Sequence, residues 1–163
     1  MTRADLDAVV QTANRCHPDY PEDRAIFAER LQLFPMGCAV FMLRGDVTGY
    51  QIAHPAIEGR PIPLNEALGA IEADADVLYV HDLALAPEAR GFHAAGKAVA
   101  NLKILTCDLG YQRLALVAVN RSSGFWERQG FVEMVLPGDD RQGLGAYGND
   151  SVYMVCELPL KAS

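Results

Sequence analysis

Apolar side chains recur at intervals of three and four residues in two segments near the start of the chain, 3–16 and 21–35. This spacing predicts two amphipathic helices, because residues three and four apart lie on one face of a helix. Thr2 or Asp5 is placed to cap the first helix. Pro35 would end the second helix.

Shorter apolar runs predict the strands. Residues 38–54 indicate two strands joined by a turn at Gly45-Asp46. Four further runs of strand length follow, at 77–85, 113–119, 131–136 and 151–158. The runs at 77–85 and 113–119 are largely apolar, as expected for central strands that are buried on both faces.

Two more helical patterns alternate with these strands. Residues 94–109 carry the strongest one, which Gly110 would end, and residues 122–130 predict a short helix. The polar segment 55–75 contains prolines, and its part 63–71 is either a short helix or a loop. A loop of this length in a compact domain is often functional, for instance as a wall of a substrate site.

This order of elements predicts a mixed α/β fold with one central sheet covered by helices. The length of 163 residues is enough for one domain with a proper core and too short for two ordinary ones. Neither a repeat nor a linker interrupts the pattern. We therefore expect a single domain over residues 1–163.

The net charge of −7 and a pI near 5.0 argue against non-specific nucleic-acid binding, because phosphate would be repelled. The sequence lacks an apolar stretch of membrane-spanning length, and its first residues do not resemble a secretory signal. The four cysteines form no C-x-x-C pair and fit reduced thiols: Cys16, Cys38, Cys107 and Cys156. We expect a cytoplasmic protein with neither a nucleic-acid nor a membrane partner.

A turn of small residues joins the strand at 77–85 to the helix at 94–109: Arg90, Gly91, Phe92, His93, Ala94, Ala95 and Gly96. A helix N-terminus leaves backbone N–H groups unpaired, and small residues let an anion approach them closely. The alternative is a tight turn that holds no ligand. The segment matches neither the P-loop nor the G-x-G-x-x-G dinucleotide motif.

A second motif, "ALVAVNRSSGFWERQGF", runs from a strand through an asparagine to a short helix over residues 115–131. Together with "LALAPEARGFHAAGKAV" over 83–99, it resembles the paired signatures of the GNAT acetyltransferases. The resemblance implies the GNAT fold, a mixed and mostly antiparallel central sheet with a parallel, splayed strand pair and helices on both faces. It also implies acetyl-CoA as co-substrate and no metal.

The resemblance places the pantetheine arm of coenzyme A along the strand at 83–85 and its pyrophosphate on the turn at 90–96. The implied cofactor-binding residues are Leu83, Ala84, Leu85, Arg90, Gly91, Phe92, His93, Ala94, Ala95, Gly96, Asn120, Ser123 and Trp126. For Asn120 the alternative is a turn residue, for Ser123 a helix cap, and for Trp126 a core side chain.

The chain departs from the family pattern in three places. His93 stands where the loop usually has glycine, so its Cβ restricts a positive φ, although its backbone N–H remains. Trp126 occupies the position of a tyrosine that often protonates the leaving thiolate, and an indole cannot serve as that acid. The family normally has a strand before the first helix, whereas this sequence starts almost at that helix, so we expect either that the strand is missing or that the given start lies too far downstream.

Direct attack of an amine on the thioester needs a base, and imidazole is suited to that role. Strand alternation would put Tyr79, His81 and Leu83 on one face and Val80 and Asp82 on the other. Some arylalkylamine-acetylating members of the family carry histidines at the positions of Tyr79 and His81. His81 is therefore the candidate base, and the alternative is a hydrogen-bonded core histidine.

Other candidate side chains have less support. Tyr79 is a further catalytic candidate or a packing residue, and Tyr153 or Tyr147 is a candidate proton donor. For Asp82 we expect a structural role. A metal site at His81 and Asp82 is disfavoured, because neighbouring strand residues point opposite ways. A serine hydrolase is disfavoured by the absence of a G-x-S-x-G elbow.

These observations favour an N-acetyltransferase that moves an acetyl group from acetyl-CoA to a primary amine. One alternative is a module that keeps the fold and binds acyl-CoA without catalysis, and another is a generic nucleotide-binding α/β domain. The acceptor, a small molecule or a peptide amine, stays open. Homodimers are common in the family, and the sequence does not decide whether this chain forms one.

Overall fold

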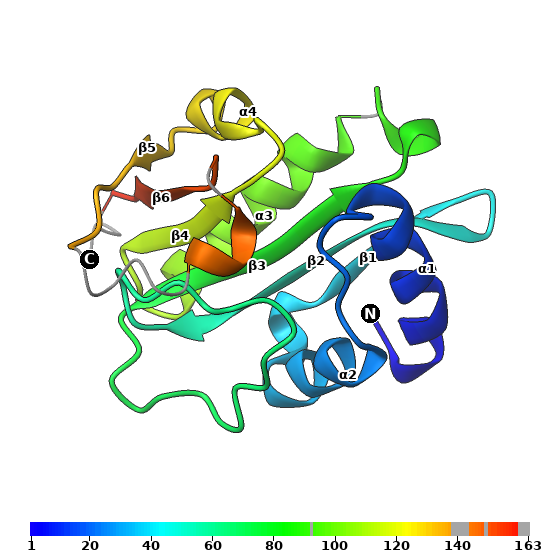
Figure 1. Cartoon of the computed structure of the whole chain (residues 1–163), viewed down its shortest axis with the longest axis horizontal. Helices are drawn as coiled ribbons and strands as arrows, with labels where there is room; N and C mark the ends of the chain where they lie inside the picture. Colours follow the sequence, from blue (N-terminus) through cyan, green and yellow to red (C-terminus); the bar gives the residue numbers. More distant parts are fainter. Residues whose placement is uncertain (92, 138–143, 149, 160–163) are drawn as a thin grey trace.

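The computed structural model describes every residue except 92, 138–143, 149 and 160–163. Within these residues the elements follow one another as Figure 1 labels them. The helices are η1 (Arg3–Asp5), α1 (Leu6–Cys16), α2 (Arg24–Leu33), η2 (Pro35–Gly37), η3 (Pro87–Ala89), α3 (Ala94–Asp108) and α4 (Ser123–Arg128), and residues 144–147 form a further 3-10 turn. The strands are β1 (Ala39–Leu43), β2 (Asp46–Ala56), β3 (Val77–Leu85), β4 (Arg113–Ala118), β5 (Val132–Glu133) and β6 (Val152–Glu157).

The described strands form one sheet in the order β1-β2-β3-β4-β6-β5. Every neighbouring pair is antiparallel except β3 and β4, which run parallel. The connection from β3 to β4 passes through α3, as a parallel crossover requires. The predicted mixed sheet with a single parallel pair is confirmed.

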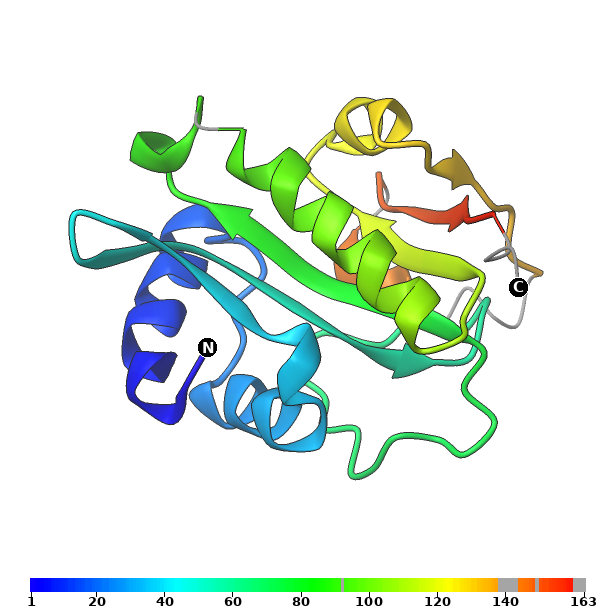
Figure 2. The same ribbon diagram turned by 180° about the vertical axis from the view of Figure 1, so that it is seen from behind.

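Helices cover both faces of the sheet. On the face seen in Figure 1, α1 and α2 pack against β1 and β2 through a core that includes Leu6, Phe27 and Ile52. On the opposite face, seen in Figure 2, α3 crosses β3 and β4. Its buried side chains Val99 and Leu102 join the core formed by those strands. The predicted helices on both faces are therefore confirmed.

The longest apolar patterns gave the most accurate element boundaries. The strand predicted at 77–85 is β3, and the helix predicted at 94–109 is α3 with one residue fewer. By contrast, the strand predicted at 131–136 is only the two-residue β5. The segment 63–71 is a loop, part of the connection between β2 and β3.

The hairpin turn lies one residue earlier than predicted. Arg44 and Gly45 both adopt left-handed backbone conformations, with φ of 56° and 97°, so they are the two central turn residues and Asp46 already belongs to β2. Two successive residues with positive φ give the turn a twist that matches antiparallel strands.

Among the described residues, the first element is η1, which leads directly into α1. The four cysteines are free thiols, as predicted. No helix in the described part of the chain combines the length and apolar character needed to cross a bilayer.

Candidate functional site

The parallel strands β3 and β4 separate part-way along their length. They pair only from Leu78 with Leu114 to Val80 with Leu116, after which β3 stays with β2 and β4 stays with β6. A cavity of about 410 Å³ occupies the resulting opening. It is walled by β3, the end of β4, α4, the start of α3 and the linker between α1 and α2.

A β-bulge in β3 changes which side chains face the cavity. Ile52 pairs with Asp82 and Ala53 pairs with Val80, so His81 is the extra residue opposite β2. The predicted strict alternation is therefore wrong at this point. His81 and Asp82 both point toward the α1 and α2 side, because a bulged residue reverses the facing of everything after it.

The bulge also removes the argument used against a metal at His81 and Asp82, because these neighbours do share a face. In the part of the chain that the structure describes, however, no group of three or more histidine, cysteine or acidic side chains is arranged to hold a metal. His81 pairs with Glu22, and Asp82 pairs with Tyr50 and His17.

His81 forms a pair with Glu22 from the α1–α2 linker. The His81 Nε2 atom lies 3.1 Å from each carboxylate oxygen of Glu22, and the two side chains are 1% and 5% exposed. Glu22 also accepts a hydrogen bond from the backbone N–H of Asn65. The His81 Nδ1 atom is buried and has no hydrogen-bond partner among the described residues. With Nε2–H donated to the carboxylate, Nδ1 keeps a free lone pair.

Asp82 forms a second pair beside the first. It accepts a hydrogen bond from the Tyr50 hydroxyl, and its Oδ1 lies 3.2 Å from His17 Nε2 at the end of α1. Burial alone would raise the pKa of Asp82, but the hydrogen bonds and charge of His17 and the Tyr50 hydroxyl outweigh it, so the pKa is lowered. Burial would lower the pKa of His17, but Asp82 raises it overall. The pair is an ion pair that joins α1 to β3.

Behind His81 lies a layer of buried rings. The ring centroids of His54 and Tyr79 lie 6.0 and 6.5 Å from that of His81. Burial lowers the pKa of His54 to about 3, so this histidine is neutral. Tyr79 is fully buried and lies beside Tyr147, whose hydroxyl donates to the Ile62 carbonyl oxygen. Tyr79 therefore supports the floor of the site and does not line the cavity.

Two described residues of the turn between β3 and α3 adopt left-handed backbone conformations. Gly91 has a φ of 92°, and His93 has a φ of 55° immediately before α3 begins at Ala94. His93 thus adopts the left-handed conformation that glycine takes without strain, and its side chain is exposed. The first amides of α3 have no helical carbonyl partner and carry the positive end of the helix dipole. Phe92 lies outside the described residues.

The opposite wall follows β4. Asn120 and Arg121 both have positive φ, 53° and 56°, and turn the chain back into α4. Asn120, Phe125 and Trp126 line the cavity. Trp126 also packs edge-on against the ring of Phe131, with centroids 5.2 Å apart, so it is anchored in the core on its other side.

The structure brings seven of the predicted site residues to the cavity wall: His81, Leu83, Leu85, Arg90, Ala95, Asn120 and Trp126. Six described ones lie near it without lining it: Ala84 is buried against α1, Gly91, His93, Ala94 and Gly96 surround the start of α3, and Ser123 begins α4. Tyr153 lies farther away, where its hydroxyl accepts a hydrogen bond from the backbone N–H of Gly59. Burial raises its pKa to about 12.

Sequence reasoning missed the wall contributed by the α1–α2 linker, namely His17, Tyr20 and Glu22. The signal of His17 and Tyr20 in the sequence is a short polar segment between two helical patterns, which also fits an ordinary connection, and Glu22 falls within the predicted second helix.

No protein-family model matches the chain, and the search of curated proteins found no match. Solved structures do match. The GNAT-like decarboxylase GphF, in complex with isobutyryl-CoA, superposes with a TM-score of 0.76 at 18% identity, over 98% of this chain and 97% of that chain. The chain has the GNAT fold.

Two further solved structures also match over most of their length. Ard1 from Thermoplasma volcanium has a TM-score of 0.72 at 11% identity, over 98% of this chain and 95% of that chain. Naa20 from Chaetomium thermophilum, in complex with a bisubstrate analogue, has a TM-score of 0.70 at 13% identity, over 97% of this chain and 84% of that chain. At these identities the GNAT likeness establishes the fold alone.

Proposed function

We propose that the protein is an acyltransferase of the GNAT type, which binds acetyl-CoA in the opening between β3 and β4 and transfers the acetyl group to a primary amine. The observation that carries the proposal is the His81–Glu22 pair on the wall of that opening. A GNAT-fold protein with isobutyryl-CoA bound supports the choice of an acyl-CoA. The bisubstrate complex of Naa20 supports transfer between two bound substrates.

In this proposal the pyrophosphate of acetyl-CoA binds the amides at the start of α3, where Arg90 adds a cation. The pantetheine arm follows Leu83 and Leu85, whose strand has no β4 partner beyond Val80. Asn120 and Trp126 form the other side of the channel. The acceptor then enters from the side of the α1–α2 linker, which places the two substrates on opposite sides of the thioester.

In the proposed reaction, the Nδ1 atom of His81 is the base. The amine nitrogen attacks the thioester carbonyl carbon, the new N–C bond forms and the C–S bond breaks. The proton lost by the amine passes to the free lone pair of His81, directly or through a water molecule. Glu22 orients the ring and stabilises the resulting imidazolium, as the carboxylate does in other His–carboxylate pairs.

The leaving thiolate needs a proton that Trp126 cannot supply. We assign this step to Tyr147, which lines the cavity and whose hydroxyl donates to Ile62. Burial raises the pKa of Tyr147, so this phenol holds its proton at neutral pH. The alternative candidate Tyr153 does not line the cavity.

The Tyr147→Phe variant is expected to lower kcat by about 10- to 100-fold while leaving the affinity for acetyl-CoA within about twofold. Steady-state kinetics and calorimetry together measure the two quantities. Tyr153→Phe serves as the matched control, and it should leave kcat nearly unchanged. If Tyr153→Phe slows turnover more than Tyr147→Phe does, the assignment is wrong.

Decarboxylation, the activity named for GphF, is a rival reaction on the same fold. A substrate carboxylate would have to lie near Glu22 and Asp82. Among the described residues on this part of the wall, the cation is His17, which is already paired with Asp82. Like charges at short range are unfavourable in a partly buried site. The charges of the cavity therefore favour an amine over a carboxylated acyl group.

The test is an amine panel supplied with acetyl-CoA, with free thiol and acetylated product both measured. Acetyl transfer predicts equal amounts of coenzyme A and N-acetyl amine. Thiol release without an acetylated amine would indicate hydrolysis. Tight acetyl-CoA binding with no turnover on any amine would leave the alternative, a binding module without catalysis.

A further inference from the structure

The loop between β2 and β3 reaches the α1–α2 linker through Asn65. We propose that Asn65 is a positioning residue of the candidate active site, which holds the Glu22 carboxylate where it can orient the His81 ring. This inference rests on the proposed function, because His81 is the base of that reaction. Asn65 itself does not line the cavity, so it acts through Glu22 and does not touch the reacting atoms.

Asn65 makes three hydrogen bonds to the linker. Its backbone N–H donates to the Glu22 Oε1 atom at 3.0 Å, and its side-chain Oδ1 accepts the backbone N–H of Asp23 at 2.7 Å. Its Nδ2 donates to the Asp23 Oδ2 atom at 3.2 Å. The Asp23 N–H belongs to the peptide group that directly follows Glu22. Asn65 therefore holds Glu22 both at its carboxylate and at its backbone.

The conformation of Asn65 explains why an asparagine suits this position. Its φ is 56°, in the left-handed region, which asparagine adopts more readily than most residues with a Cβ atom. Glycine would adopt this backbone but has no side chain to bond with Asp23. Aspartate would accept the Asp23 N–H, but it lacks the donor and would place a second negative charge against the Asp23 carboxylate. Asparagine combines the backbone conformation, the acceptor and the donor.

Glu22 depends on such contacts because secondary structure does not hold it. It lies in the linker between the end of α1 at Cys16 and the start of α2 at Arg24. Its side chain is 5% exposed, and in the described part of the chain its carboxylate is hydrogen-bonded to His81 and to the Asn65 N–H. A buried carboxylate needs donors for its oxygens, and a long side chain keeps several rotamers unless contacts select one. The contacts of Asn65 select the rotamer that meets His81.

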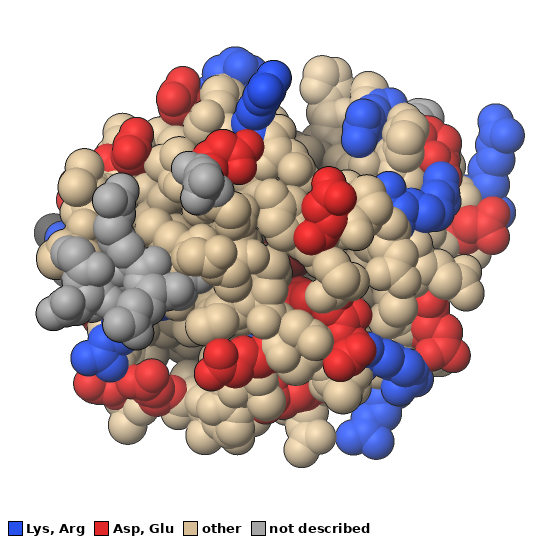
Figure 3. Space-filling model, viewed as in Figure 1, with Lys and Arg blue, Asp and Glu red and all other residues tan. Residues whose placement is uncertain are grey.

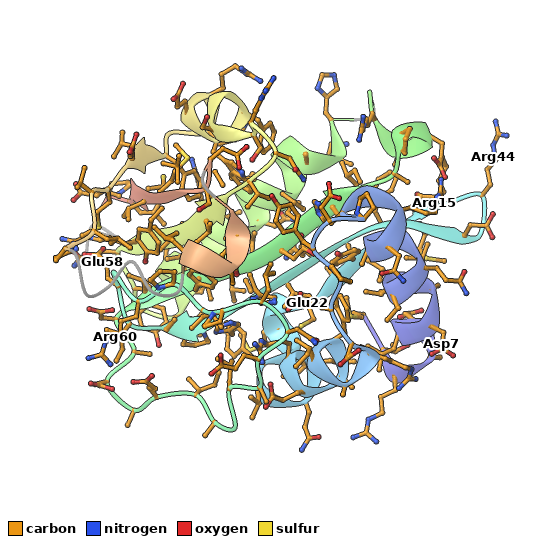
Figure 4. The ribbon with its side chains drawn as sticks, in the orientation of Figure 1. Asp7, Arg15, Glu22, Arg44, Glu58 and Arg60 are labelled. Atoms are coloured by element: carbon orange, nitrogen blue, oxygen red, sulfur yellow. The ribbon has the colours of Figure 1, made fainter. Side chains whose placement is uncertain are left out.

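Neutral donors hold this carboxylate from the side of the loop. Figure 4 labels Glu22 near the centre of the molecule, whereas the other side chains that it labels lie at the edge. Figure 3 shows acidic atoms at the centre of the same face and basic atoms toward its edges. The buried guanidinium of Arg30 on α2 bonds to Glu29 and to the Glu66 carbonyl oxygen. The backbone amide of Asn65 is therefore the group of the loop that bonds to Glu22.

The rest of the loop is held at other points, so a change at Asn65 should act locally. The backbone N–H groups of Leu68 and Gly69 donate to Glu29, and the Tyr147 hydroxyl donates to a carbonyl oxygen of the loop. Asn65 itself is exposed. Variants at this position should therefore fold.

The test exchanges the donor and the acceptor between residues 23 and 65. Asn65→Asp removes the donor and sets two carboxylates together, so kcat for amine acetylation should fall about three- to tenfold. The KM for acetyl-CoA should stay within about twofold, because the cofactor binds on the other side of the cavity. The double variant Asp23→Asn, Asn65→Asp keeps the net charge and restores the pair, so its kcat should return to within about twofold of the natural value. A double variant as slow as Asn65→Asp would contradict the inference.

Two further comparisons test whether the effect passes through Glu22. In the Glu22→Gln background, Asn65→Asp should lower kcat by less than about 1.5-fold, because the carboxylate that Asn65 positions is gone. Glu29→Gln weakens the attachment of the same loop away from Glu22, and it should leave kcat within about twofold. A full loss from Asn65→Asp in the Glu22→Gln background would overturn the inference. If Asn65→Asp does not fold, Asn65→Gly keeps the left-handed backbone and takes its place in each comparison.

A measurement on His81 itself separates this inference from the proposed function. Nitrogen-15 spectra of protein with labelled histidine show which ring nitrogen of neutral His81 carries the proton, and His81→Ala identifies its signals. The natural protein should show the Nε2–H form, and Asn65→Asp a mixture of both forms. If the exchange variant restores the Nε2–H form but no amine is acetylated, the positioning of Glu22 by Asn65 stands and the catalytic proposal fails. If Asn65→Asp has the natural His81 signals and the natural kcat, the inference is overturned while acetylation stands.

Discussion

The His81→Ala variant is expected to lose about 10²- to 10⁴-fold in kcat/KM for amine acetylation, because it removes the base that accepts the amine proton. The loss should be greatest on the part of the pH profile where activity rises as the base loses its proton. That rise should be absent from the variant. Acetyl-CoA affinity should change little, because His81 faces the α1–α2 side and not the loop that begins α3.

Two further variants test whether this effect comes from the His81–Glu22 pair. Glu22→Gln keeps the size of the side chain and removes the negative charge that stabilises the imidazolium, so it should also lower kcat by at least tenfold. His93→Ala removes an exposed histidine from the same protein and should leave the pH profile as it is. A His81→Ala enzyme with an unchanged profile would exclude this histidine from the mechanism.

The Asp82→Asn variant is expected to lose about 2 kcal/mol of the free energy of unfolding near pH 5.5. Asp82 and His17 are only 18% and 22% exposed, so water screens their attraction weakly. Asparagine keeps an oxygen for the Tyr50 hydroxyl but leaves the His17 imidazolium without its partner charge. Denaturant titration of both proteins across the pH range measures the difference.

The pH dependence of this difference has a defined sign. The pKa of Asp82 is lowered, so its contribution is present above its ordinary value of 3.8 and is lost as the pH falls below it. The pKa of His17 is raised, so its contribution is present below its ordinary value of 6.5 and is lost as the pH rises through the raised value. The two proteins should therefore differ most between these values.

The control for the stability prediction is Asp7→Asn. Asp7 pairs with Arg24 on the surface, where both side chains are more than half exposed, and such pairs contribute little. Its effect should stay below about 0.5 kcal/mol at every pH. A difference between natural protein and Asp82→Asn that does not change from about pH 5.5 to pH 9 would contradict the ion pair.

The sequence predicted those parts of the fold that long apolar patterns determine. The run at 77–85 is bounded by polar segments and is buried along most of its length, so its limits match β3. The second helix begins at Arg24 and not at residue 21, because the backbone is still extended at Asp23. Propensity alone does not distinguish those starting points, since proline and acidic residues suit both.

The candidate site was predicted in part. The loop before α3 and the residues after β4 carry local signals, a turn of small residues and a strand-to-helix asparagine. The partner of His81 carries none, because Glu22 reaches it from a linker 59 residues earlier in the chain. The bulge at His81 depends on how β2 pairs with β3, which no single strand encodes.

His93 shows how a residue can depart from a motif and still keep its geometry. The family pattern has glycine there, and the structure gives His93 the left-handed φ of 55° that glycine would adopt. The cost of that conformation is about 1–2 kcal/mol for a residue with a Cβ atom. His93 itself is exposed.

The most direct test of the central claim is calorimetric titration of the protein with acetyl-CoA. We expect one site with micromolar affinity. His93→Gly should bind acetyl-CoA equally well or more tightly, because glycine adopts the left-handed conformation without strain. Gly96→Glu should abolish binding, because a Cβ at Gly96 meets open space and its carboxylate would face the pyrophosphate. The neutral Gly96→Gln should retain most of the affinity. If neither the natural protein nor His93→Gly binds acetyl-CoA, coenzyme A is not a ligand of this protein. If Gly96→Glu still binds it, the pyrophosphate does not lie at the start of α3.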